Sequence, residues 1–329
     1  MTKFKTHKNN KAKTFTVKGA AAIVTALVLA LIALFGMTAC SNAAQPGTGT
    51  GGSTALPEAP FVEGGASLIL SPNKLVINVR VRTADGTPVT VEGCEETTLT
   101  SGTETVLHAK GTLVILKGKI IELDCWGNQL TELNVQGCTA LQELKCGRNR
   151  LTELNVQGLT ALQELSCNGN QLTELNVQGC ASLQTLYCYY NQLTALDVQG
   201  LTALEILHCG SNQLTALNVQ GLNALQNLGF GNNQLTALNV QGLSALRYLT
   251  CWSNQLNAEA FIKIFNDLPT WTESDNACCS LYTEQTGVTE GNYTDFTTPS
   301  EVQAAFQNAK DVKKWKMYKY NGNWPGEKI

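Results

Sequence analysis

The sequence predicts a solenoid of stacked coils, each supplying one short parallel β-strand, and three observations lead to this fold class. A unit of 21 residues recurs without insertion from Ile120, and the seventh copy starts at Leu246 and departs after Leu256. Apolar residues fall at the same positions in every copy, and an asparagine follows them each time. One such unit cannot bury its own apolar side, so neighbouring units are expected to stack.

Each constant residue of the unit has an expected structural task. The apolar positions of one coil should stack on those of the next, as in Leu141, Leu144, Cys146, Leu151, Leu154, Val156 and Leu159. A column of asparagines should bond the backbone where the chain leaves each strand: Asn128, Asn149, Asn170, Asn191, Asn212, Asn233 and Asn254. A column of glycines should form turns with positive φ: Gly137, Gly158, Gly179, Gly200, Gly221 and Gly242.

The first half of each unit reads L-x-x-L-x-C-x-x-N-x-L, the signature of a leucine-rich repeat with cysteine in an apolar position. Over about residues 60–329 the chain resembles the leucine-rich-repeat surface lipoproteins of anaerobic and oral bacteria, and more distantly the internalin-like repeats. The resemblance implies a right-handed solenoid, or horseshoe, with one parallel strand per coil on its concave side. It also implies a β-rich N-terminal region and an α/β cap at the C-terminal end.

The chain contains 12 cysteines, a number that in an exported protein ordinarily indicates disulfides. Here most of them recur at core positions of the repeat, where Phe230 replaces the one missing member. We therefore predict that eight act as small buried hydrophobes: Cys125, Cys138, Cys146, Cys167, Cys180, Cys188, Cys209 and Cys251. The vicinal pair Cys278-Cys279 has no explanation in the sequence, and either member could bond to Cys94 only if the chain ends met.

Residues 1–39 are predicted to be a lipoprotein signal peptide. Six lysines precede an apolar run from Ala20 to Met37, and the small residue Ala39 comes directly before Cys40. The segment resembles the lipobox of bacterial lipoproteins, in which this cysteine is lipidated, although Met37 stands where the motif usually has leucine. An uncleaved membrane anchor and ordinary cleavage are the alternatives, and all three export the chain.

Composition and patterning set the other boundaries. Residues 40–60 are rich in Ser, Gly, Thr, Ala and Pro and are expected to be a flexible tether. Residues 61–119 contain strand-like runs and should cover the open end of the first coil, with a separate small domain as the alternative. Residues 120–256 hold the seven repeats. Residues 257–329 should cap the other end.

Particular elements are expected in both flanking regions. On the N-terminal side we expect strands over 75–82, 88–91, 106–108 and 113–116, the first two joined as a hairpin through Asp85-Gly86. On the C-terminal side we expect a helix over 257–265, a strand over 280–283, a helix N-capped by Ser300, and a strand over 315–318. A crossover would add these two strands, in parallel, to the solenoid sheet. Asn292-Tyr293-Thr294 has the form of a glycosylation sequon and nothing more.

Composition argues against several function classes. Without the segment before Cys40, 17 basic residues (23 minus 6) face 26 acidic ones, a net charge of −9, which disfavours nucleic acid as a partner. The only histidines are His7, His108 and His208, which excludes a multi-histidine metal site. No catalytic triad, Cys-His pair or zinc-finger spacing occurs, so we predict no enzyme activity, cofactor or metal. One alternative is a calcium ion held by Glu122, Asp124, Glu143 and Glu164, although Lys145 and Arg148 could relieve their repulsion.

Positions beside the buried leucine and cysteine of each strand vary freely, and they should point outward from the concave sheet. They are charged in the first coils and aromatic later. Two aromatic walls are expected about 14 Å apart, Tyr187, Tyr189 and Tyr190 facing Tyr248 and Trp252. The floor between them would consist of His208, Gly210, Gly229 and Gly231. The alternatives are drift on an unconstrained surface, and glycines that only make room for the large Phe230.

These observations predict an exported, lipid-anchored protein of the outer membrane or cell surface. Its concave face would bind a protein or glycan partner, as in adhesion, through the aromatic trough between the two walls. The membrane would be contacted through lipid on Cys40. The alternative function is that of a structural spacer lipoprotein of the envelope, which would bind no ligand.

Overall fold

The computed structural model describes residues 58–329, which belong to one compact unit. The predicted signal peptide, Cys40 and nearly all of the predicted tether lie outside the described residues. Within residues 58–329, no helix is long enough and apolar enough to cross a membrane.

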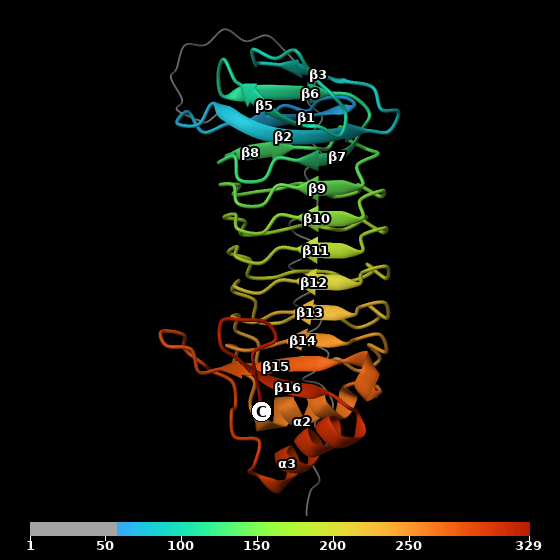
Figure 1. The fold of residues 1–329 in the computed structure, drawn as a ribbon, viewed down its shortest axis with the longest axis vertical. Coiled ribbons are helices and arrows are strands. Elements are labelled where there is room, and N and C mark those ends of the chain that lie inside the picture. The colour runs from blue at the N-terminus through green and yellow to red at the C-terminus, as the bar shows by residue number, and fades with distance from the viewer. Residues whose placement is uncertain (1–57) are drawn as a thin grey trace, which may run out of the picture. The chain divides into compact units, whose positions relative to one another are not determined.

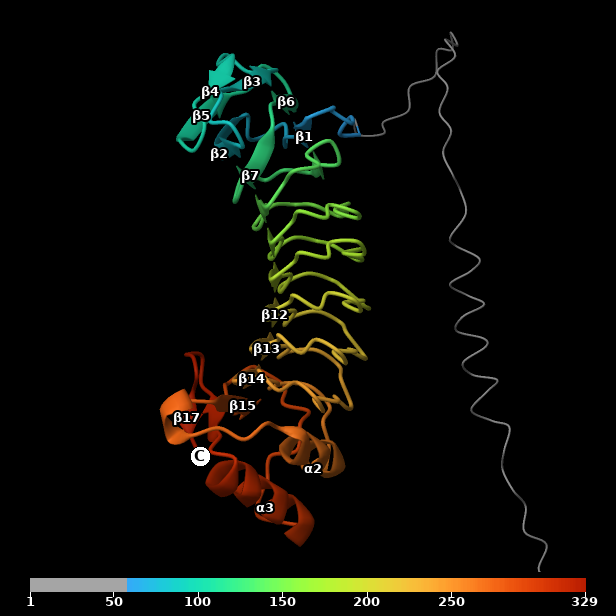
Figure 2. The same ribbon diagram turned by 90° about the vertical axis from the view of Figure 1, so that its right-hand side faces the viewer.

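The repeats form a stack of coils, each carrying one short strand of a single parallel sheet (Figure 1). These strands are β7 (Ile120–Asp124), β9 (Glu143–Lys145), β10 (Glu164–Ser166), β11 (Thr185–Tyr187), β12 (Ile206–His208), β13 (Asn227–Gly229) and β14 (Tyr248–Thr250). Equivalent residues pair across coils, so that Leu165 lies opposite Leu144 on one side and Leu186 on the other. The strands lie along the hollow side of the stack, and both capping regions project beyond them (Figure 2).

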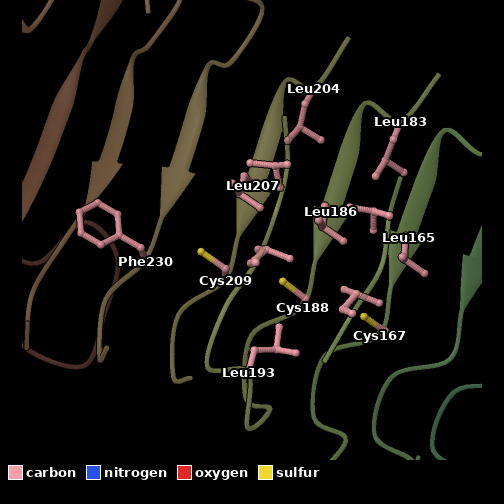
Figure 3. Close-up of a cluster of buried hydrophobic side chains, with 14 of the residues drawn as sticks. Leu165, Cys167, Leu183, Leu186, Cys188, Leu193, Leu204, Leu207, Cys209 and Phe230 are labelled. Atoms are coloured by element: carbon pink, nitrogen blue, oxygen red, sulfur yellow. The ribbon is translucent and has the colours of Figure 1, made fainter. Parts of the chain in front are cut away.

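The interior is a ladder of identical side chains, in which leucines and cysteines of successive coils point the same way (Figure 3). All eight cysteines predicted to be hydrophobes are buried, and every cysteine among the described residues is free. Burial raises the pKa of Cys167 to about 12, so its thiol stays neutral. Phe230 is also fully buried and fills the ladder position that lacks a cysteine. The prediction that these eight cysteines act as buried core residues, although the chain has many cysteines, is confirmed.

The asparagine column ties consecutive coils together as predicted. The side-chain nitrogen of Asn170 donates to the carbonyl oxygens of Cys146 at 3.0 Å and Cys167 at 2.9 Å, one in each of two coils. Its side-chain oxygen accepts a hydrogen bond from the backbone N–H of Leu151 at 3.1 Å. The same pattern repeats along the stack, so these amides satisfy backbone groups that leave the sheet.

The glycine column is confirmed for all but its first member. Gly158, Gly179, Gly200, Gly221 and Gly242 have φ values between 76° and 84°. Gly137 does not have positive φ, so for this residue the predicted reason was wrong. A Cβ atom on Gly137 would lie 1.7 Å from the carbonyl oxygen of Val62. The N-terminal segment packs so closely here that only glycine fits.

The N-terminal region contributes strands to two sheets. Its elements are β1 (Gly65–Ile69), β2 (Val76–Thr83), β3 (Val89–Glu92), β4 (Thr98–Leu99), β5 (Glu104–His108) and β6 (Leu113–Lys117). The first coil carries β7 and a second short strand, β8 (Glu132–Asn134). β2 pairs antiparallel with β7, and β1 pairs antiparallel with β8, so both edges of the first coil are covered. The predicted hairpin is wrong, because β2 and β3 lie in different sheets although Gly86 makes a turn with φ 72°.

The C-terminal region closes the other end of the stack. It contains α2 (Ala258–Asp267), a 3-10 turn (Glu273–Asp275), β15 (Cys278–Thr283), α3 (Ser300–Gln307), a π turn (Asn308–Val312), β16 (Lys316–Tyr320) and β17 (Glu327–Lys328). β15 pairs parallel with β14, and β16 pairs parallel with β15, so the predicted crossover adds two strands to the sheet. The prediction that Ser300 is the N-cap is wrong, because Ser300 is the first residue of α3 and Pro299 occupies the N-cap position.

Asn292 ends the asparagine ladder, which the sequence did not reveal. It is buried, and its side-chain nitrogen donates to the carbonyl oxygens of Cys251 at 2.8 Å and Leu281 at 2.9 Å. Its side-chain oxygen accepts from the N–H of Leu256 at 3.0 Å. The sequon-like triplet therefore continues the ladder from a loop of the cap, and its amide is not available to a glycan.

The vicinal cysteines follow from the strand that carries them. In β15, Cys279 lies opposite Leu249, and Cys278 lies opposite Tyr248. Successive residues of a strand point to opposite faces, so the two thiols face different sides of the sheet. Cys94 belongs to the N-terminal region, beyond the first coils, where its backbone forms an isolated antiparallel β-bridge with Ala109. The two capping regions lie at opposite ends of the stack, which excludes the bond between Cys94 and this pair (Figure 1).

Candidate functional site

A cavity of about 440 Å³ opens on the strand side of the later coils, at the predicted trough. Most of the predicted site residues line it: Tyr189, Tyr190, His208, Gly210, Gly229, Gly231 and Trp252. Tyr187 and Tyr248 do not. Tyr187 packs edge-on against His208, with ring centroids 5.3 Å apart, and Tyr248 packs edge-on against Trp324 at 6.3 Å. Each of these tyrosines thus packs against a ring that lines the trough.

The C-terminal region supplies part of the trough, and sequence reasoning missed this contribution. Trp324, on the turn between β16 and β17, lines the cavity and is 51% exposed. Ser211, Asn227 and Thr250 add neutral polar groups to the lining. An exposed tryptophan in the turn-rich segment N-G-N-W-P-G was the available signal. Its place in space depends on β16 lying two strands beyond β14 in the sheet, which no repeat pattern specifies.

Trp252 is a fixed part of the floor and not a free wall. Its indole stacks on Tyr320 with ring centroids 4.5 Å apart and an interplanar angle of 3°. A Cβ atom on Gly231 would lie 2.8 Å from the indole, and one on Gly229 would lie 3.2 Å from the ring of His208. These glycines make room for Trp252 and His208, while Phe230 points into the core.

His208 is held in its neutral form at the floor of the trough. Burial lowers its pKa below the usual value, while a hydrogen bond with Asn227 acts weakly in the other direction. Tyr187, which lies against it, has a raised pKa because of burial and therefore stays protonated. None of the residues lining the trough is an aspartate, glutamate, lysine or arginine. The site is uncharged at neutral pH.

We expect a pH dependence of stability from His208. Its pKa is lower in the folded state than in the unfolded chain, so its contribution is complete above about pH 6.5 and is lost as pH falls below that value. Urea unfolding at pH 7.5 and pH 5 should show a smaller loss of stability in His208→Gln than in the wild type. His108→Gln is the control with opposite sign, because its hydrogen bond with Glu96 raises the pKa of His108. Equal losses in wild type and His208→Gln would contradict the assignment.

The predicted acidic cluster of the first coils is neutralised by protein cations. Glu122 pairs with Arg82, and Asp124 lies 3.9 Å from Arg80, both arginines coming from β2. Lys145 pairs with Glu143. It also lies 3.7 Å from Glu164. Arg148, predicted to help, instead lies over the ring of Trp126 at 5.9 Å. These ion pairs relieve the repulsion among the four carboxylates, which was the reason for considering calcium.

A larger hollow of about 730 Å³ runs along the first coils, lined among others by Glu132, Glu153, Glu174, Asn155 and Asn176. The asparagines belong to the L-N-V-Q-G part of the repeat, which changes little from coil to coil, whereas the glutamates occur in the first three coils and alanine takes their place in the next three. Asn155 and Asn176 form a backbone bridge between neighbouring coils. The hollow combines stacked asparagines with glutamates of the first three coils, and we assign it no ligand.

Comparison with known proteins agrees with this architecture. A family model for leucine-rich repeats in two copies matches residues 181–223. No curated protein matches the chain.

Among solved structures, the functional domain of InlJ from Listeria monocytogenes, which includes a cysteine ladder, is similar with 23% identity and a TM-score of 0.41. The match covers 56% of this chain and 47% of that domain, so the chain spans about half its length. A Shigella effector leucine-rich-repeat domain has 22% identity and a TM-score of 0.44, over 60% of this chain and 80% of the domain. The protein LIC12759 of Leptospira interrogans has 21% identity and a TM-score of 0.35, over 55% and 56%.

The fold is thus established by the stacked coils themselves, and the family match falls on two of them. Leucine-rich-repeat proteins are generally scaffolds without enzyme activity that bind other proteins through an extended concave surface. This chain folds as a leucine-rich-repeat solenoid between a β-rich N-terminal region and an α/β cap.

Proposed function

We propose that the chain is an exported, lipid-anchored surface protein that binds a protein or glycan partner through the trough on its strand face. The observation that carries this proposal is the exposure of two large rings at one cavity, Tyr190 at 63% and Trp324 at 51%. Exposed aromatic side chains gathered around a hollow provide binding area at low entropic cost. The uncharged lining argues against nucleic acid, which requires clustered cations.

The spacer alternative predicts a face without any ligand, and a binding screen separates the two functions. We would screen a peptide display library and a glycan array with the wild type and with the double variant Tyr190→Asn, Trp324→Ala. The proposal expects ligands that the wild type retains and the double variant loses, with the same melting temperature for both proteins. If every retained ligand binds both proteins equally, the trough is not the site and the spacer function becomes the better one.

Lipid anchoring rests on the lipobox-like segment ending in Cys40 and is tested separately. Because the lipidated group would be the thiol of this cysteine, cells expressing the wild type should incorporate radiolabelled fatty acid into the protein. Cys40→Ala should abolish the label, whereas Cys94→Ala, which removes a buried cysteine of the folded region, should keep it. Label persisting in Cys40→Ala would contradict lipidation at this position. Protease accessibility on intact cells would test the surface location.

A further inference from the structure

Tyr190 occupies a backbone position where a tyrosine is unfavourable. The residue before each ladder asparagine has positive φ, between 50° and 70°, in all seven coils. Its occupants are Gly127, Arg148, Gly169, Tyr190, Ser211, Asn232 and Ser253. A bulky side chain is uncommon in this left-handed conformation. Tyr190 is also 63% exposed, and its ring meets Tyr189 edge-on at 5.5 Å. Folding therefore gains little from this ring and bears a conformational cost for it.

Trp324 approaches the same cavity from the C-terminal cap. It lies on the short connection between β16 and β17, and it packs edge-on against Tyr248 at one side. The stacked pair of Trp252 and Tyr320 joins the last coils to β16. Two exposed rings thus border a cavity whose floor is fixed by packed aromatic side chains. Such a preformed arrangement loses little entropy when a ligand enters.

The lining of the trough combines aromatic surfaces with neutral hydrogen-bonding groups. Ser211 and Thr250 offer hydroxyls, Asn227 offers an amide, and His208 offers a neutral ring. The sheet beneath is saturated, because strands β11 to β14 pair with neighbours on both sides. An extended peptide would find no free strand edge for its amides, and its charged side chains would find no counter-charge. Buried polar groups without partners cost free energy, which disfavours a peptide here.

We infer that the trough binds a neutral oligosaccharide, an inference that rests on the proposed function and specifies its ligand. The apolar C–H faces of sugar rings would lie on Tyr190 and Trp324, as aromatic surfaces accept apolar groups. Sugar hydroxyls, which donate and accept, would bond the side chains of Ser211, Asn227 and Thr250. The cavity of about 440 Å³ falls in the range of ligand sites, and its open form suits part of a longer chain.

The test uses the full chain in mild detergent and measures binding by isothermal titration calorimetry. The probes are neutral hexasaccharides of β-1,4-linked glucose, α-1,4-linked glucose, β-1,4-linked mannose and β-1,4-linked N-acetylglucosamine. Hexagalacturonate serves as the acidic counterpart. We expect at least one neutral hexasaccharide to bind with a dissociation constant below about 10 mM, and hexagalacturonate to bind with a larger one.

Three variants connect binding to the trough. Tyr190→Asn and Trp324→Ala should each weaken binding of that hexasaccharide about tenfold or more. Tyr190→Asn should keep or raise the midpoint of unfolding, because asparagine accepts the left-handed conformation, whereas a merely structural tyrosine would lower it. Arg148→Asn is the matched control: it changes the same backbone position two coils away, outside the cavity, and should leave binding unchanged.

The outcomes separate this inference from the proposed function. Failure of all four neutral hexasaccharides to bind overturns the inference, as does equal binding by the wild type and both trough variants. If a displayed peptide instead binds the wild type and loses affinity in Tyr190→Asn, the trough is the site but the ligand class is wrong. If no ligand of either class depends on Tyr190 or Trp324, the proposed function fails as well.

Discussion

Asn233→Ala should lower the free energy of unfolding by about 3 kcal/mol, because several buried backbone groups lose a partner at once. The side-chain oxygen of Asn233 accepts from the N–H of Leu214 at 3.0 Å. Its nitrogen donates to the carbonyl oxygens of Cys209 at 3.1 Å and Phe230 at 3.0 Å. Each of these carbonyls keeps a second asparagine donor, but the N–H of Leu214 would remain buried and unpaired. Urea unfolding followed by circular dichroism measures the loss.

The preceding residue provides a matched control. Asn232 is exposed, and its side chain makes a single hydrogen bond to the hydroxyl of Ser211 at 3.2 Å. Asn232→Ser introduces the residue that two other coils carry at this position, as in Ser253. We expect a change within about 0.5 kcal/mol, as for most surface substitutions. Equal losses for the two variants would mean that the ladder contributes no more than an ordinary surface amide.

Gly137→Ala should also cost about 3 kcal/mol, because the added methyl group meets backbone that cannot turn away. Its Cβ would lie 1.7 Å from the carbonyl oxygen of Val62 and 2.9 Å from that of Gly65. The N-terminal segment would have to move, and with it the hydrogen bond from the N–H of Gly65 to Val62. Limited proteolysis near Val62, together with urea unfolding, would report the displacement.

Gly158→Ala separates this clash from the effect of positive φ. Gly158 has a φ of 76°, and a Cβ there would meet nothing within 4 Å. Its replacement should cost only about 1 kcal/mol, the price of a left-handed non-glycine residue. It should leave the N-terminal segment as resistant to protease as in the wild type. A Gly137→Ala protein no less stable than Gly158→Ala would show that the segment at Val62 adapts freely.

The part of the candidate site that the sequence predicted is the part built from repeats. Tyr189, Tyr190, His208 and Trp252 stand at equivalent or neighbouring positions of successive coils, so the period alone brought them to one face. Their detailed roles did not follow from it. That Trp252 lies flat on Tyr320 required the position of β16, which belongs to the cap. Trp324 could not be predicted as a site residue for the same reason, because its position also depends on that of β16.

The sequence by itself determined the coil, its core and its register, because each coil contacts mainly its neighbours and every such contact recurs after the same number of residues. One period therefore specified the leucine and cysteine ladders, the asparagines and the direction of the variable side chains. The tertiary structure alone decided what happens at the ends. There, Arg80 and Arg82 neutralise the first coils, Asn292 completes the ladder, and Trp324 borders the trough. These contacts join segments without any common period, so only the folded packing of the two caps onto the stack brings them together.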